Sequence, residues 1–252
     1  MQEQNVYSWL YATDPSEIHD RSLDTYEPET GEWLFRSPDW NSWLAKKTRC
    51  LWVHGIPGAG KTIFASHLIE NVKDHCLDRG PGGVCVYYYC HYSHTQDETA
   101  PFLRWVLLEL CRRLGQVPQA VYDLYRYGGK PTARGLLRTL ERVVRPFDKV
   151  YIFVDAVDES LSRENLLRVL RELATGPAFQ NIRLLATSRE YADIEEVMAD
   201  ISTPISMRNP FLDEDIARYV QSKINSNSRM KRWPAQLRED VRNALSAEAN
   251  GM

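Results

Sequence analysis

The chain has 252 residues, and 43% of them are hydrophobic, which is enough for one large domain with a sizeable core. Its net charge of −3 excludes the strong positive field that draws basic proteins to nucleic acid or anionic membranes, so we expect neither partner. Five cysteines without a Cys-x-x-Cys pair, no apolar leader and no apolar run of about 20 residues predict a cytoplasmic protein with reduced thiols.

Residues 1–48 are predicted to form a tryptophan-rich lead-in. Four of the seven tryptophans lie here, at Trp9, Trp33, Trp40 and Trp43. Because the segment is too short for an independent domain, we expect short helices that pack through these rings on the domain that follows. A separate binding module is the alternative.

Residues 49–208 alternate between two kinds of pattern. Short runs rich in β-branched, aromatic and leucine residues predict strands at 49–54, 84–90, 149–154, 182–187 and 202–207. Apolar residues three and four positions apart predict helices at 65–72, 103–114, 137–144 and 166–173. This alternation predicts an α/β fold with a mostly parallel sheet and helices on both faces.

Residues 209–252 follow the dipeptide Asn209-Pro210 and contain two further helical patterns, at 213–225 and 234–249. A polar stretch separates them. We expect these helices to begin a helical lid.

The first strand leads into a phosphate-loop pattern. The segment from Gly55 to Thr62 reads GIPGAGKT and matches G-x-x-x-x-G-K-[ST]. In such a loop the backbone N–H groups and the positive end of the next helix bind phosphate. The predicted nucleotide-binding residues are Gly55, Ile56, Pro57, Gly58, Ala59, Gly60, Lys61, Thr62 and Ile63. Lys61 would reach the terminal phosphates, and Thr62 would hold Mg²⁺.

Acidic residues follow the third predicted strand. Asp155 ends an apolar run, and Asp158 and Glu159 come three and four residues later. The carboxyl ends of strands in open α/β sheets face the ligand, so Asp155 is predicted to bind Mg²⁺ together with Thr62. Either Asp158 or Glu159 would orient the attacking water. Taken alone, this motif is also compatible with an ordinary acidic turn after a strand.

The fourth predicted strand ends at Thr187, Ser188 and Arg189. An arginine at this edge can detect a terminal phosphate through bidentate hydrogen bonds, so Arg189 is the predicted γ-phosphate sensor. Considered by itself, it could also be a surface arginine that caps a strand end.

Two other clusters have simpler interpretations. Cys85, Cys90, His91 and His94 lie within ten residues but match no common zinc spacing, and burial in a strand is the favoured explanation for the cysteines. Four arginines, Arg134, Arg138, Arg142 and Arg145, share one face of a predicted helix. A solvated face is the default there, and a surface that contacts a second subunit or a phosphate is the alternative.

Together the three strand-end motifs, with Ala156 directly after Asp155, resemble the NACHT group of STAND NTPases. The lead-in segments 30–34 (TGEWL) and 40–44 (WNSWL) are similar to the nephrocystin-3-like N-terminal domain, which is abundant in fungal NLR-like proteins that often carry ankyrin repeats. The resemblance runs from about Tyr7 to Met252. In such relatives a further apolar helix follows the last residues, ANGM, so the resemblance implies that this chain ends inside an element of the lid.

This resemblance implies a three-layer P-loop NTPase of the ASCE type with five strands in the order 5-1-4-3-2. It divides the chain into the lead-in (1–48), the NTPase core (49–208) and the start of a lid (209–252). It also implies a nucleotide-controlled switch in fungal innate immunity or heterokaryon incompatibility. Such a switch assembles homo-oligomers and signals through repeat or sensor domains further along the protein.

The favoured function is therefore a regulatory module that binds and slowly hydrolyses a nucleoside triphosphate with Mg²⁺. Lys61, Asp155, Asp158, Glu159 and Arg189 would form its catalytic set. The guanine-reading Asn-Lys-x-Asp pattern does not occur, which favours ATP without excluding GTP. The alternatives are a small-molecule or nucleotide kinase and a scaffold that binds nucleotide without turnover.

Overall fold

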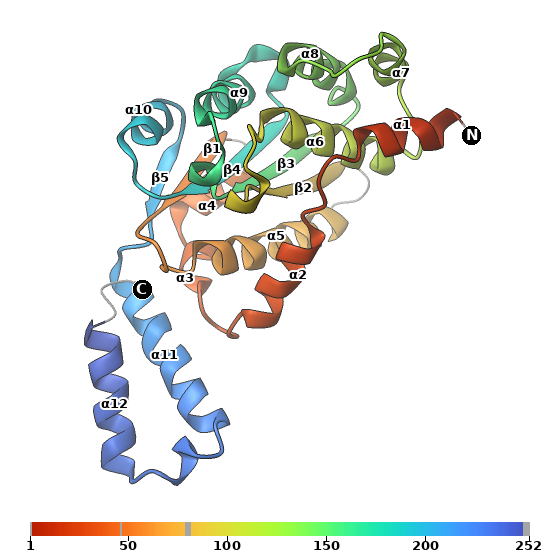
Figure 1. Ribbon diagram of the computed structural model, residues 1–252. Coiled ribbons are helices and arrows are strands. Elements are labelled where there is room, and N and C mark those ends of the chain that lie inside the picture. The colour runs from red at the N-terminus through yellow and green to blue at the C-terminus, as the bar shows by residue number, and fades with distance from the viewer. Residues whose placement is uncertain (1, 46, 79–81, 249–252) are drawn as a thin grey trace.

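The computed structural model describes residues 2–45, 47–78 and 82–248, and its centre is a five-stranded parallel sheet (Figure 1). The strands are β1 (Cys50–His54), β2 (Gly83–Tyr89), β3 (Lys149–Asp155), β4 (Ile182–Ser188) and β5 (Thr203–Ser206). They lie in the order β2-β3-β4-β1-β5, which confirms the expected order 5-1-4-3-2. β5 has four residues, includes Pro204 and forms one edge of the sheet.

The predicted strand ends differ slightly from the observed ones. β3 and β4 each extend one residue beyond the apolar run, so that Asp155 and Ser188 belong to strands, while β5 is shorter at both ends. Apolar patterning marks the buried part of a strand, whereas the backbone ladder can include the polar residue that follows. Asp155 and Ser188 are therefore the last residues of β3 and β4, at the carboxyl edge of the sheet.

Side chains alternate between the two faces of the sheet, and each face has its own core. One face is covered by α1 (Gln2–Leu10), α6 (Thr99–Leu114), α7 (Gln119–Arg126), α8 (Ala133–Val143), α9 (Arg163–Thr175) and α10 (Ala192–Ile201). The other face is covered by α3 (Glu32–Phe35), α4 (Pro38–Leu44) and α5 (Lys61–Asp78), with α2 (Ser16–Thr25) beside α5. The fold is therefore a three-layer α/β structure.

The lead-in, residues 1–48, contributes to both faces. α1 buries Val6 and Leu10 in the core around α6, whereas α4 buries Trp40 and Trp43 in the core around α5. The Trp43 indole donates a hydrogen bond from Nε1 to the carbonyl oxygen of Leu184 in β4, over 3.0 Å. Trp43 thus fixes α4 directly on the sheet.

The segment after β5 forms the C-terminal hairpin, made of α11 (Pro210–Ser226) and α12 (Ala235–Glu248). Figure 1 shows this hairpin projecting away from the sheet and its covering helices. Asn209 caps α11, since its side chain accepts hydrogen bonds from the N–H groups of Phe211 and Leu212. The expected helix end at residue 249 and the expected continuation at 249–252 lie outside the described residues.

None of the helices in the described part of the chain is long and apolar enough to span a bilayer.

Candidate functional site

The phosphate-loop pattern forms the turn between β1 and α5, as predicted for a loop that feeds a helix N-terminus. Gly58 and Gly60 have φ angles of 82° and 79°, which glycine adopts readily and other residues do not. The ammonium of Lys61 donates hydrogen bonds of 2.8 Å to the carbonyl oxygens of Gly55 and Ile56. The Lys61 side chain therefore folds back onto the start of its own loop.

Asp155 joins three elements at the carboxyl edge of the sheet. Its Oδ2 accepts a 2.8 Å hydrogen bond from the hydroxyl of Thr62 at the start of α5, and its Oδ1 accepts a 2.5 Å bond from the hydroxyl of Thr187 in β4. The residue is 3% exposed. Burial raises the pKa of Asp155 to about 6, although the two hydroxyl donors act to lower it. Thr187 was not among the predicted site residues.

The residue after this aspartate has an unusual backbone. Ala156 has a φ of 54°, in the left-handed region, and its N–H donates a 2.9 Å hydrogen bond to the Thr187 hydroxyl. This conformation costs about 1–2 kcal/mol for a residue with a Cβ atom, and the hydrogen bond to Thr187 helps to hold it. The following residues, Asp158 and Glu159, belong to a single 3-10 turn at Val157–Glu159.

The structure places Asp158 and Glu159 in different surroundings. Asp158 is paired with Arg189: its Oδ1 accepts the Arg189 backbone N–H at 3.0 Å, and its Oδ2 lies 3.2 Å from the guanidinium Nε. Glu159 instead accepts the backbone N–H of Tyr92 at 3.0 Å. Both acids and the predicted sensor arginine thus lie at the same edge.

The acidic residues of this edge affect the pKa of Lys61. Burial lowers the pKa of its ammonium, while Asp158 and Asp155 act in the opposite direction. All five residues of the predicted catalytic set are therefore brought to one edge of the sheet.

A cavity of about 540 Å³ opens beside the phosphate loop at Gly58, Ala59 and Gly60. Its apolar walls come from three places: the lead-in supplies Trp33, α5 supplies Ile63 and Phe64, and α11 supplies Leu212 and Ile216. A few polar groups, including Tyr26 and Asp215, complete the lining. An apolar cavity with a small number of polar groups is typical of a small-molecule site.

Gly58, Ala59, Gly60 and Ile63 of this cavity are among the predicted nucleotide-binding residues, whereas the lining residues from the lead-in and from α11 were not predicted. The available signal was the spacing of Leu212, Ile216 and Tyr219, which places an apolar stripe on one face of α11. Nothing in the sequence indicated that the loop before Trp33 would lie opposite that stripe.

The Cys85 to His94 segment adjoins this edge, since the Cys90 N–H donates a 3.0 Å hydrogen bond to the carbonyl oxygen of Asp155. Within the described ranges no group of three or more His, Cys, Asp or Glu side chains is placed to hold a metal ion, so the Cys85 to His94 cluster forms no such centre. On α8, Arg134, Arg138 and Arg142 are exposed, and Arg145 pairs with Glu141 at 3.2 Å.

Comparison with known proteins supplies the family. The sequence profile of the family described as nephrocystin 3, N-terminal, matches residues 29–189, which is more than half of the chain. The chain belongs to the nephrocystin 3 N-terminal family. The match begins in the loop before α3 and ends at Arg189, so it includes all three strand-end motifs, the phosphate loop among them.

One curated relative and two solved structures are also similar to this chain. The chain is 23% identical over 235 residues to the vegetative incompatibility protein HET-E-1 of Podospora anserina, covering 87% of this chain and 17% of that protein. The ORC1 protein of Aeropyrum pernix, solved in complex with DNA, aligns with a TM-score of 0.52 and 11% identity over 95% of this chain and 59% of that one. The ORC2 protein of the same organism, described as ADPNP-ADP complexes, aligns with a TM-score of 0.48 and 15% identity over 82% of this chain and 55% of that one.

These comparisons confirm the predicted resemblance to the nephrocystin-3-like domain and the P-loop NTPase fold. This member of the nephrocystin 3 N-terminal family spans about a sixth of the curated relative's length.

Proposed function

We propose that this domain binds a nucleoside triphosphate with Mg²⁺, hydrolyses it slowly and serves as a regulatory switch within a larger NLR-like signalling protein. The observation that carries the proposal is the convergence of the phosphate loop, the buried Asp155 and an adjoining apolar cavity at one sheet edge. Each part fits a different portion of a nucleotide.

The phosphates fit the loop between β1 and α5. The helix that follows has 18 residues, so the partial positive charge at its N-terminus favours an anion. Lys61, now bonded to the loop carbonyls, is within the same turn and would transfer its hydrogen bonds to the terminal phosphates.

Magnesium fits the chemistry of Thr62 and Asp155. A hydroxyl and a carboxylate lie 2.8 Å apart, and both are the hard oxygen ligands that Mg²⁺ prefers. Bound there, the ion would supply charge neutralisation for the phosphates. Thr187 would keep the carboxylate oriented, because it donates to the other carboxylate oxygen.

The cavity fits the base and ribose. It begins at Gly58 to Gly60, where the phosphates would lie, and its walls are mostly apolar and aromatic. We favour ATP as the ligand and keep GTP as a candidate. The finer parts of the proposal, namely the three-part domain division, nucleotide-dependent homo-oligomers and downstream repeat or sensor domains, follow from the family resemblance.

Replacing the loop lysine tests nucleotide binding. Lys61→Ala removes the only charged side chain of the loop, so we expect affinity for fluorescent mant-ADP with Mg²⁺ to fall at least about 100-fold. Fluorescence titration measures it. Lys130→Ala, an exposed lysine in the turn before α8, is the matched control and should bind like the parent. Equal binding by Lys61→Ala and the parent would refute the proposed function.

Turnover distinguishes a hydrolase from the kinase and scaffold alternatives. We expect slow release of inorganic phosphate from ATP without any added acceptor, because a switch requires a long-lived bound state. Release that depends on an added acceptor would favour a kinase. Tight binding with no release under either condition would favour a scaffold.

A further inference from the structure

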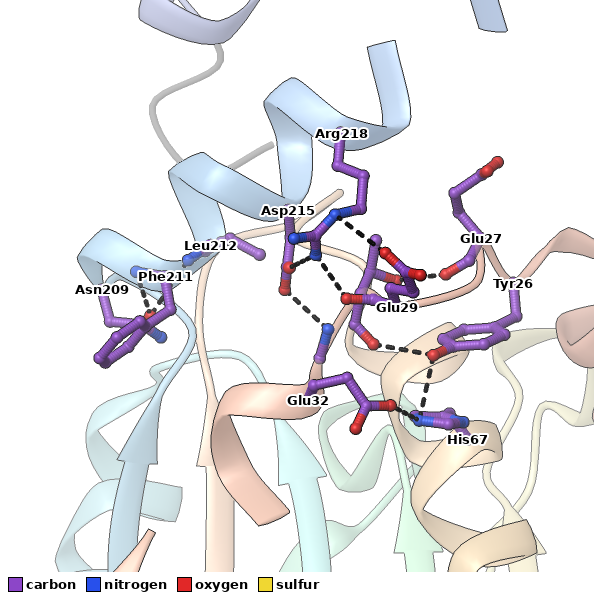
Figure 2. A network of polar contacts seen from close by, with 12 residues as sticks. Tyr26, Glu27, Glu29, Glu32, His67, Asn209, Phe211, Leu212, Asp215 and Arg218 are labelled. Atoms are coloured by element: carbon purple, nitrogen blue, oxygen red, sulfur yellow. Dashed lines mark hydrogen bonds and ion pairs between the residues drawn. The ribbon is translucent and has the colours of Figure 1, made fainter. Parts of the chain in front are cut away.

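One contact joins the lead-in to the C-terminal hairpin beside the cavity (Figure 2). Asp215 of α11 is 9% exposed, and its Oδ2 accepts a 2.7 Å hydrogen bond from the backbone N–H of Gly31. Its Oδ1 lies 3.3 Å from Nη1 of Arg218, which also donates to the carbonyl oxygen of Glu29. Two residues of one helix thus bind the short loop 27–31.

The same loop is bound on its other side to α5, the helix that starts at the phosphate loop. The Tyr26 ring stacks on His67 with ring centres 4.1 Å apart, and its hydroxyl donates to the carbonyl oxygen of Thr30. At Gly31 an added Cβ would lie 2.8 Å from the ring of Phe64, so the loop contacts α5 closely there. Loop 27–31 is therefore held between α5 and α11 as one side of the cavity.

Asp215 is a costly residue for this position if packing is its only role. Burial raises the pKa of its carboxyl group, while the Gly31 N–H and the Arg218 charge act to lower it. An apolar residue at the same place would fill the space without that cost. The carboxylate does what an apolar side chain cannot, because it accepts the Gly31 N–H across the gap between two segments 184 residues apart.

We propose that Asp215 is a positioning residue for the part of the nucleotide that carries the base and ribose. It holds loop 27–31 and α11 in contact, and so keeps the cavity closed around that part of the ligand. The phosphates do not depend on this contact, because their loop lies between β1 and α5. The inference rests on the proposed nucleotide function and adds to it a named group that sets how long the nucleotide remains bound.

The test uses two ligands that differ only in what the cavity would hold. With Asp215→Ala, we expect mant-ADP with Mg²⁺ to dissociate at least about tenfold faster, because the wall of the cavity loses a buried hydrogen bond. The affinity for pyrophosphate with Mg²⁺ should stay within about twofold of the parent. A fold that was merely weakened would lose both ligands together.

Asp213→Ala is the matched control, since Asp213 is exposed on the same helix and lines neither side of the contact. The mant-ADP dissociation rate of this variant should equal that of the parent.

Arg218→Ala removes the partly exposed half of the contact, so we expect its mant-ADP dissociation rate to increase about threefold. This variant provides the test if Asp215→Ala does not fold. The positioning role alone would be overturned if the variants that fold released mant-ADP at the parental rate. It would also be overturned if they lost affinity for pyrophosphate as strongly as for mant-ADP. A parent that binds neither ligand would overturn the proposed function itself.

Discussion

At the scale of single residues, the two acids after β3 have separate environments and so separate expected roles. Asp158 already satisfies both carboxylate oxygens with Arg189. Glu159 has one backbone donor, from Tyr92, and its remaining oxygen can accept a further hydrogen bond. Glu159 is therefore the better candidate to orient water, and Asp158 the better candidate to hold the arginine.

Paired substitutions test this division. We expect Glu159→Gln to lower phosphate release from ATP about 100-fold while mant-ADP affinity stays within about twofold, because a general base contributes to the chemical step. Asp158→Asn should instead reduce the preference for ATP over ADP, because it releases Arg189. Release of phosphate and competition between ATP and ADP measure the two effects. If Asp158→Asn released phosphate slowly and Glu159→Gln released it at the parental rate, Asp158 would be the residue that orients water.

The sequence predicts the charged residues at the carboxyl edge of the sheet, but it does not predict the Thr187 hydroxyl that orients Asp155. Asp155 and Arg189 each follow an apolar run, and parallel strands place such ends together. The bond from Thr187 to Asp155 depends on β4 lying next to β3, a pairing that apolar patterning does not encode. Asp215 is harder still, since its partner is a backbone N–H in the lead-in.

At the scale of elements, α2 is attached through one buried histidine. His19 is 2% exposed, its Nδ1 lies 2.9 Å from the Tyr89 hydroxyl, and its Nε2 lies 2.9 Å from Oε1 of Glu70. Its ring also stacks on Tyr87 at 4.3 Å. The contact connects α2 to both β2 and α5.

This histidine gives a pH-dependent prediction. Burial lowers the pKa of His19 from 6.5, outweighing the nearby Glu70 carboxylate; Lys73 acts in the same direction as burial and Asp20 opposes it. The unfolded chain then binds the proton more readily than the folded one, so the free energy of unfolding falls as the pH drops below about 6.5. Chemical denaturation between pH 7 and 5 measures the slope, which should be smaller in His19→Gln.

Gln116→Ala, which changes an exposed side chain with no titratable group, serves as the control and should keep the parental slope. An unchanged slope in His19→Gln would mean that His19 is not a source of the acid sensitivity.

The elements themselves follow from the sequence to different degrees. The five strands and the long helices α5, α6 and α9 are predictable because long apolar stripes and runs specify them. The helices α7 and α10 were not predicted from the sequence; they are short and bury one and three residues respectively. Lead-in helices such as α3, with four residues, form because tertiary contacts hold them, so periodicity cannot reveal them.

At the scale of the whole molecule, the two cores and the C-terminal hairpin differ in how they are supported. The sheet is covered on both faces, and the lead-in joins both cores. In α12 none of the side chains described, at positions 235–246, is buried. Its main contact is with α11.

We therefore expect hydrogen exchange to separate the hairpin from the rest. Amides of β1, β3 and β4 should exchange only through global unfolding, whereas those of α12 should exchange through local opening at much lower free energy. Mass spectrometry of exchanged peptides measures this difference, with α8, a surface helix that buries Leu136, Thr139, Leu140 and Val143 in the core, as the internal comparison. Equal protection of α12 and the central strands would contradict it.

The short edge strand β5 has a consequence for self-association. Exposed strand edges are templates on which another chain can add its own strand, the route to aggregates and fibrils. β5 offers only four residues for such pairing, and one of them, Pro204, has no N–H to donate. This edge of the sheet is therefore a poor seed for fibril growth, even when the protein is concentrated.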